Sequence, residues 1–125
     1  MSFLINSTFL IGGQNTDAIP VQTIDSEIGY YTDVLGFTVT AMDATTASLE
    51  RDGVRIGLAV SDEDPEQFSL GFSVSDVEAA YAEIAAKNGT PSALRTDTYD
   101  GKRYRVFFAK EPYGVCFCFS QPMTE

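Results

Sequence analysis

The sequence predicts an α+β domain made of two copies of one unit, each containing a strand, a helix and three further strands. The same order of elements occurs on both sides of an acidic, proline-containing segment at residues 61–67, which we interpret as a linker. The two halves also match at a constant offset of 53 residues. The matched pairs are Val21/Val74, Ile24/Val77, Asp25/Glu78, Ile28/Tyr81 and Gly36/Gly89. Any two βα units share part of this pattern, but agreement in register indicates an internal duplication.

The chain length fits a single domain. With 125 residues the chain can bury one core, so the two units are expected to pack together. We place the first unit at about residues 7–60 and the second at about residues 68–121.

In the first unit, a short strand is predicted at residues 18–21, and a helix follows it. Thr23 is a suitable N-cap and Gly36 is placed to end the helix. The apolar residues at helical spacing are Ile24, Ile28, Tyr31 and Leu35. Alternating residues at 37–42 predict the next strand.

A hairpin completes the first unit. Its strands are expected at residues 46–51 and 54–60. Between them stands Asp52-Gly53, a dipeptide that favours the positive φ angles of a two-residue hairpin turn.

The second unit repeats this order. A strand at residues 68–74 precedes a helix with Asp76 as the N-cap and Gly89 after its end. The apolar face of that helix consists of Val77, Ala80, Tyr81 and Ile84. The last three strands are expected at residues 93–98, 102–109 and 115–120, with Asp100-Gly101 as the turn between the first two.

Charge and hydropathy exclude two classes of partner. The net charge is −10, from 18 acidic and 8 basic residues, and the bases form no stripe that would follow a nucleic-acid backbone. No apolar run approaches the roughly 20 residues that a membrane-spanning helix needs. Residues 1–13 lack the basic start and the cleavage site of a secretory signal peptide. We expect no nucleic-acid partner and no membrane partner.

Cysteine and histidine usage constrains the chemistry. The two cysteines are close in sequence, so a disulfide framework is not expected and a reducing, cytoplasmic compartment is favoured. The chain has no histidine, which removes the usual general base near neutral pH and the commonest ligand of transition metals. We expect no metal and no other cofactor.

The two cysteines lie two residues apart on the last predicted strand. Cys116 and Cys118 should therefore share one face, with Phe117 and Phe119 on the other. A disulfide between them is disfavoured because their side chains stand parallel. They are short of partners for a metal, and a nucleophilic Cys118 would need a nearby cation. We interpret them mainly as small residues lining a pocket, with a reactive thiol and a soft-metal site as alternatives.

Four segments together resemble the vicinal oxygen chelate superfamily, which contains glyoxalase, bleomycin-resistance proteins, fosfomycin-resistance proteins and extradiol dioxygenases. The segments are IPVQTIDSEIGYYTDVLGF, LERDGVRIGLAV, FSVSDVEAAYAEIAAKNG and RVFFAKEPYGVCFCF, and they span about residues 16–121. The resemblance implies two βαβββ modules whose strands form a curved mixed sheet around a cleft. It also implies a homodimer, because small chains of this family commonly complete the cleft with a partner.

The family's metal ligands come from four strand positions, which the resemblance places at Thr16, Gly57, Ser69 and Cys118. These residues depart from the histidines and carboxylates of the metal-bearing members, since glycine has no side chain and hydroxyls are weak ligands. The turn also departs from the family's usual Asp-Pro-Asp-Gly, because here it is Glu111-Pro112-Tyr113-Gly114. Metal-dependent chemistry is therefore not carried over.

On the neighbouring strand, Tyr104, Val106 and Phe108 share one face, and the resemblance makes that face the cleft. Arg103 and Arg105 fall on the opposite alternation, and Tyr99 and Tyr113 are candidate rim contacts. The predicted ligand-binding residues are Tyr104, Phe108, Cys116, Cys118, Ser69 and Gly57.

The family also has metal-free members of the bleomycin-resistance type, which sequester a cationic drug without chemistry. An acidic chain without histidine fits that type, so we expect metal-independent binding of an aromatic or cationic small molecule. The alternatives are a lyase, isomerase or oxygenase of the same superfamily with a non-standard site, and an interaction module whose cleft is filled by its own side chains. The sequence does not identify the ligand, and no catalytic residue is assigned.

Overall fold

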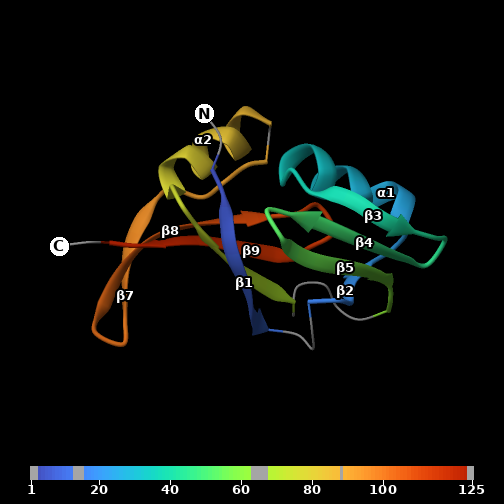
Figure 1. Ribbon diagram of the computed structural model, residues 1–125, viewed down its shortest axis with the longest axis horizontal. Coiled ribbons are helices and arrows are strands. Elements are labelled where there is room, and N and C mark those ends of the chain that lie inside the picture. Colours follow the sequence, from blue (N-terminus) through green and yellow to red (C-terminus); the bar gives the residue numbers. More distant parts are fainter. Residues whose placement is uncertain (1–2, 13–15, 63–67, 88, 124–125) are drawn as a thin grey trace.

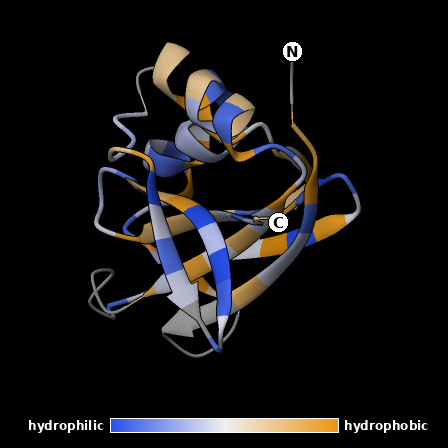
Figure 2. Cartoon of the chain, turned by 90° about the vertical axis from the view of Figure 1, so that its left-hand side faces the viewer, coloured by the Kyte–Doolittle hydropathy of each residue, from blue (hydrophilic) through white to orange (hydrophobic). Residues whose placement is uncertain are grey.

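The computed structural model describes residues 3–12, 16–62, 68–87 and 89–123, and it contains two curved mixed sheets with helices on one side of them (Figures 1 and 2). This confirms the predicted α+β class, although the strands form two separate sheets instead of one. Most of the predicted linker, residues 63–67, lies outside the described residues.

The first sheet contains the four strands of the first unit. Across the sheet they are β2 (Ile19–Val21), β5 (Val54–Val60), β4 (Thr46–Arg51) and β3 (Thr38–Met42). The strands β2 and β5 are parallel and the other pairs are antiparallel. Between β2 and β3 the chain forms α1 (Ile24–Gly29), which continues as a π-helical turn, η1 (Tyr30–Val34).

The second sheet repeats this order and adds one strand. Across the sheet the strands are β1 (Ile5–Gly12), β6 (Ser69–Val74), β9 (Cys116–Pro122), β8 (Lys102–Lys110) and β7 (Arg95–Tyr99). The helix α2 (Val77–Ala86) follows β6. The added strand β1 pairs antiparallel with β6, so residues 7–12, which the sequence assigned to the first unit, lie in the sheet of the second.

The predicted helix caps are confirmed. The Thr23 hydroxyl accepts a hydrogen bond from the Ser26 backbone N–H at 3.1 Å, and the Asp76 carboxylate accepts one from Ala79 at 3.1 Å. The two caps are 53 residues apart, as the duplication requires. Each satisfies a backbone donor that the first turn of a helix leaves without a partner.

The two predicted hairpin turns are confirmed as well. Asp52 and Gly53 have φ angles of 53° and 83°, and Asp100 and Gly101 have 52° and 78°. Two successive positive φ angles define the turn that matches the right-handed twist of the flanking strands.

The glycines that follow the two helices act differently. Gly36 takes the left-handed conformation with φ of 76°. At the end of α2 it is Thr90, with φ of 48°, that takes this conformation. Gly89 is needed for space instead, because a Cβ there would meet side-chain atoms of Ile84 and Val34.

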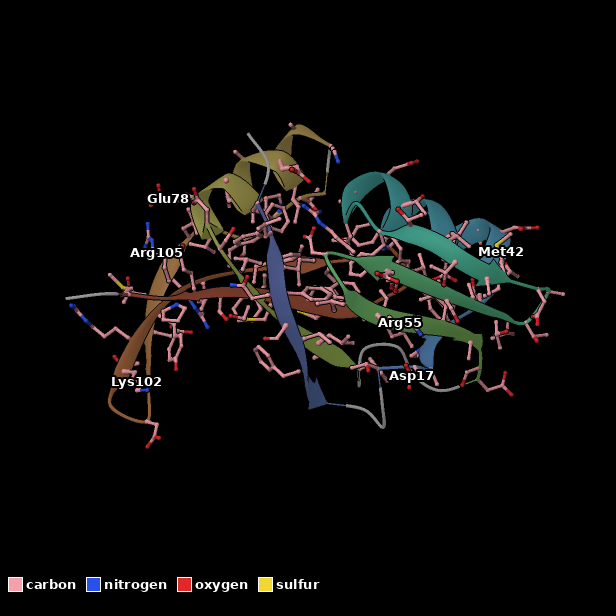
Figure 3. The ribbon with its side chains drawn as sticks, in the orientation of Figure 1. Asp17, Met42, Arg55, Glu78, Lys102 and Arg105 are labelled. Carbon is pink, nitrogen blue, oxygen red and sulfur yellow. The ribbon has the colours of Figure 1, made fainter. Side chains whose placement is uncertain are left out.

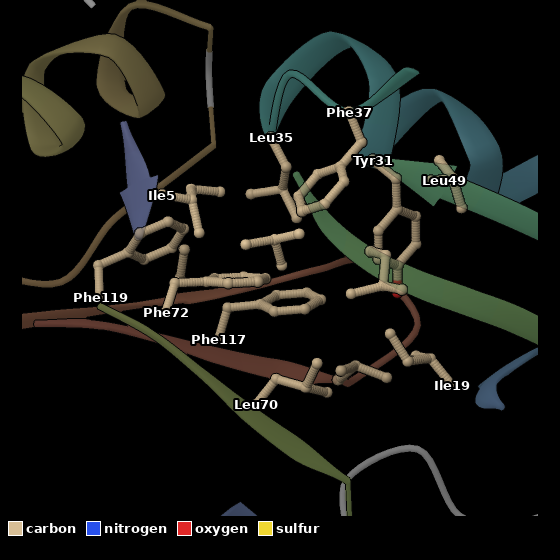
Figure 4. Close-up of a cluster of buried hydrophobic side chains, with 14 of the residues drawn as sticks. Ile5, Ile19, Tyr31, Leu35, Phe37, Leu49, Leu70, Phe72, Phe117 and Phe119 are labelled. Carbon is tan, nitrogen blue, oxygen red and sulfur yellow. The ribbon is translucent and has the colours of Figure 1, made fainter. Parts of the chain in front are cut away.

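A connected row of aromatic rings forms the core between the helices and the second sheet (Figure 4). Successive ring centroids are 4.8–5.7 Å apart along Tyr31, Phe117, Phe72, Phe119, Phe107 and Tyr81. The row begins on η1 and ends on α2. It therefore joins the two units by dispersion and by edge and stacked ring contacts.

Arg51, at the end of β4, connects segments from both units. Its guanidinium donates to the carbonyls of Leu35 at 2.7 Å and Phe3 at 2.8 Å, and it lies over the Phe3 ring at 4.1 Å. It also pairs with Asp52 at 3.3 Å and with Glu83 on α2 at 3.4 Å. The Arg51 side chain is 9% exposed, so these contacts are largely shielded from water.

We predict that Arg51→Met lowers the free energy of unfolding by about 3 kcal/mol, because it leaves the carbonyls of Leu35 and Phe3 without their donor and removes one cation from the partly buried Glu83. Arg55→Met is the matched control, since Arg55 is 82% exposed and pairs with Glu50 at 3.8 Å. That variant should change stability by less than about 0.5 kcal/mol. Urea denaturation of both measures the difference, and equal losses would contradict the role given to Arg51.

Candidate functional site

The candidate site is the face of the second sheet that points away from the helices, which we call the open face. Phe117 and Phe119 are buried in the core, whereas Cys116 and Cys118 are partly exposed on the other side of β9. This confirms the predicted alternation. On β8, Phe108 pairs with Cys118, and its neighbour Phe107 packs against Tyr81 of α2.

The predicted aromatic residues also lie on the open face. Tyr104 pairs with Pro122 and shares the alternation of Phe108. Arg105 lies on the opposite side, near Glu78 of α2, as predicted (Figure 3). Of Tyr99 only the backbone is described, so its predicted rim contact lies outside the described side chains.

The added strand brings an aromatic ring to the open face that the sequence analysis missed. Gly71 of β6 pairs with Cys118, and the Phe9 ring of β1 lies directly on Gly71. Any side chain at position 71 would collide with that ring. Phe9 is 43% exposed, so the glycine creates room for an accessible ring next to Cys118.

A second missed feature comes from β7. The Arg95 guanidinium carbon lies 4.9 Å from the centre of the Phe108 ring, and Arg95 pairs with Asp97 at 3.1 Å. Both side chains are partly exposed and both influence the Cys118 thiol electrostatically. The open face therefore holds a planar cation stacked on an aromatic ring and paired with a carboxylate.

The two thiols are not activated. Burial, Cys116 and Asp97 raise the pKa of Cys118 to about 11, against a smaller lowering by Arg95. Burial also raises the pKa of Cys116, against a lowering by Lys110. Because the thiolate is the nucleophile, a raised pKa lowers the reactivity of both thiols at neutral pH. The interpretation as pocket-lining residues is favoured over a reactive thiol.

Of the two predicted positions on or near the first sheet, Thr16 and Gly57, the second is closed by backbone. The Gly57 N–H donates to the Thr16 carbonyl at 2.8 Å, and the Asp17 carbonyl covers the place where a Cβ of residue 57 would stand. Figure 3 labels Asp17 and also Arg55, which belongs to the same strand, β5, as Gly57. Ser69 is opposite Cys116 in the second sheet. The ligand-binding roles of Gly57 and Ser69 stay predictions.

The donor set does not fit the family's metal. Of its four positions, Gly57 has no side chain and lies beneath the backbone, and Thr16 and Ser69 offer only neutral hydroxyl groups. Across the described parts of the chain, no three histidine, cysteine or acidic residues gather in a way that could hold a metal ion. No step of a reaction is therefore derived through a metal.

Two hollows lie away from the open face. One of about 660 Å³ is lined by residues around Arg51, including Thr38, Glu50, Glu83 and Lys87. The other, of about 460 Å³, lies at the start of α2 beside Arg105 and Gln121. Neither of these two hollows is lined by Tyr104, Phe108 or the cysteines.

The family model described as "Glyoxalase/Bleomycin resistance protein/Dioxygenase superfamily" matches residues 13–119, so the chain belongs to this superfamily. A comparison with curated proteins finds no match. No helix among the described segments is long and apolar enough to cross a membrane.

Solved structures share the fold. A bleomycin resistance determinant encoded on the transposon Tn5 has a TM-score of 0.75 at 19% identity, covering 90% of this chain and 99% of that one. A bleomycin-binding protein from Streptomyces verticillus, complexed with copper(II)-bleomycin, has a TM-score of 0.66 at 19% identity, covering 86% and 93%. A glyoxalase/bleomycin resistance protein/dioxygenase from Alicyclobacillus acidocaldarius has a TM-score of 0.73 at 17% identity, covering 86% and 89%. At these identities the likeness shows the fold alone.

We predict that alkylation of Cys118 by iodoacetamide, measured in Cys116→Ser protein, accelerates about tenfold per pH unit up to about pH 11. At pH 8 only about one thiol in a thousand is then ionised. The same protein unfolded in guanidinium should titrate near the ordinary value of about 8.5. A plateau below pH 9 in the folded protein would contradict a buried, protonated Cys118.

We predict that Gly71→Ala costs roughly 1–2 kcal/mol of stability, because its methyl group displaces the Phe9 ring. In a Phe9→Ala background the same change should cost less than about 0.5 kcal/mol, since the ring is gone. A double-mutant cycle by urea denaturation gives the coupling. Additive effects would show that Phe9 does not pack on Gly71.

Proposed function

We propose that the open face binds a small aromatic or cationic molecule without a metal, and that a second copy of the chain completes the site. The observation that carries this proposal is the position of Arg95 on Phe108, with Asp97 as its partner. The chain's own guanidinium occupies the place where we expect a planar cation of the ligand to lie. Family membership and the fold shared with a bleomycin-binding protein support the same class of ligand.

The surroundings of Phe108 suit a ligand that is partly apolar. Cys118 is directly opposite Phe108 across the β8–β9 ladder, and its thiol is neutral. On the far side of Cys118, Phe9 offers a second accessible ring. Two rings with a small neutral group between them give a platform for stacking, and Asp97 supplies the charge that selects a cation.

A second wall is needed because a small-molecule site normally buries about 70–90% of the surface of its ligand. The open face covers only one side of a molecule stacked on Phe108, and neither hollow includes it. A second copy of the chain would supply the other side of the site and bury Phe9.

We place the protein in the cytoplasm, because both cysteines are free thiols.

The alternative, a lyase, isomerase or oxygenase of the same superfamily, needs an acid or base positioned over the open face. Glu111 has a raised pKa because it is buried, but it is 2% exposed and faces the helices. Its position therefore does not favour an enzyme at the open face.

The test is titration of the protein with benzamidinium and with bleomycin, followed by calorimetry and by tyrosine fluorescence, which is undisturbed because the chain lacks tryptophan. Asp97→Asn and Phe108→Ala should each weaken binding about tenfold, because they remove the charge partner and the ring. Arg95→Ala should strengthen benzamidinium binding about three-fold, because it removes the internal competitor.

Arg105→Ala is the matched control, since Arg105 lies on the helix side of the same strand. It should leave binding unchanged. Sedimentation at micromolar concentration tests the dimer. The proposal fails if neither the native protein nor the Arg95→Ala variant binds either compound, or if Phe108→Ala and Asp97→Asn leave the affinity unchanged.

A further inference from the structure

The charged side chains of the open face are mostly basic, although the chain as a whole is acidic, with a net charge of −10. Within the described strands of the second sheet, the charged residues on the open-face alternation are three bases, Arg95, Lys102 and Lys110, and one acid, Asp97. Three positive charges against one negative charge give this face a net charge of +2. An acidic chain that places its cations around accessible rings creates a local potential that attracts an anionic group.

Lys110 stands next to Phe108 on the open face. Lys110 is directly opposite Cys116 in the β8–β9 ladder, and Phe108 is directly opposite Cys118, so all four side chains point to the same side. The charge of Lys110 also acts on the Cys116 thiol, which places the ammonium group near that end of β9. Lys110 is exposed, so a ligand on the open face can reach it.

The cation position lies on the other side of the Phe108 ring. Arg95 is directly opposite Val106 in the β7–β8 ladder, and Asp97 is directly opposite Tyr104. The Arg95 guanidinium carbon is 4.9 Å from the centre of the Phe108 ring, and the ion pair of Arg95 with Asp97 is 3.1 Å long. A planar cation that replaces this guanidinium is therefore held between an aromatic ring and a carboxylate.

The Phe108 ring thus lies between a position for a cation and a position for an anion. Val106, at the level of Arg95, and Lys110 are four residues apart, which is about 13 Å along a strand. The long lysine side chain can shorten that separation by leaning along the apolar surface. A ligand that reaches both positions has a planar cation, an aromatic ring and a short chain that ends in an anion.

We propose that the open face takes a zwitterionic aromatic ligand, whose planar cation lies on Phe108 against Asp97 and whose carboxylate lies at Lys110. This inference rests on the proposed function and deepens it, because it adds an anionic group to the molecule that the site selects. A simple aromatic cation such as benzamidinium uses the ring and the acid of the site and leaves Lys110 unused.

The test uses two probes of equal length. The first, para-amidinophenylpropionate, carries an amidinium, a ring and a carboxylate, and the second, para-amidinophenylpropionamide, has a neutral amide in place of the carboxylate. Calorimetry at low ionic strength should show that the acid binds about fivefold more tightly than the amide, the gain of one exposed ion pair. The ratio of the two affinities should approach one in about 0.5 M salt, because salt screens an exposed pair.

Three variants locate the carboxylate. Lys110→Gln should bring the ratio of the two affinities close to one. Lys102→Gln is the matched control and should keep the ratio, since Lys102 lies on the same face of β8 but at the turn of the β7–β8 hairpin (Figure 3). Both lysines are exposed, so neither variant removes a buried contact. Arg95→Ala should strengthen the binding of both probes and keep their ratio, because it removes the internal cation and leaves Lys110 in place.

Equal affinities of the two probes at low salt, or a ratio that persists in Lys110→Gln, would overturn the inference. It is also overturned if Arg95→Ala, and not Lys110→Gln, abolishes the ratio, because the carboxylate would then lie on Arg95. Each of these outcomes leaves the proposed function standing, provided that benzamidinium and the amide probe bind and lose affinity in Phe108→Ala and Asp97→Asn. If neither probe binds and benzamidinium and bleomycin do not bind either, the inference and the proposed function fail together.

Discussion

The buried guanidinium of Arg51 is the contact on which the arrangement of the segments depends. It binds the carbonyl at the end of the first helical segment, the carbonyl of Phe3 and a carboxylate on α2. The next residue, Asp52, accepts a hydrogen bond from the Ile5 N–H at 2.9 Å and so fixes the start of β1. One hairpin end thereby positions the strand that carries Phe9 to the open face. Loss of this anchor should disturb the site as well as the core.

The two faces of the second sheet carry different kinds of side chains. Large aromatic rings on one face form the row that holds the helices, and this burial supplies much of the driving force for folding. The other face is left with small residues between a few rings, as at Gly71 and Cys118. We propose that a ligand or a second chain covers the exposed rings of this face.

Local signals in the sequence were sufficient to predict much of the fold. The caps at Thr23 and Asp76 and the two Asp-Gly turns depend on hydrogen bonds and φ preferences within a few residues, which a sequence displays directly. Alternation within each strand, together with the family resemblance, placed Cys118 and Phe108 on one face. The strand β1 could not be foreseen, because it pairs with β6, and the paired residues are 57–69 positions apart in the sequence. The stacking of Arg95 on Phe108 could not be foreseen either, because the hairpin of β7 and β8 does not by itself fix which side chains meet on its face.

The most direct test of the account is a crystal structure of the protein soaked with benzamidinium, because it shows the ligand, the open face and any second copy together. The account predicts the amidinium against Asp97, its ring on Phe108, Arg95 turned away, and a second chain covering the other side. A cation bound only in the hollow beside Arg51, with Arg95 still on Phe108 and the open face in solvent, would contradict it.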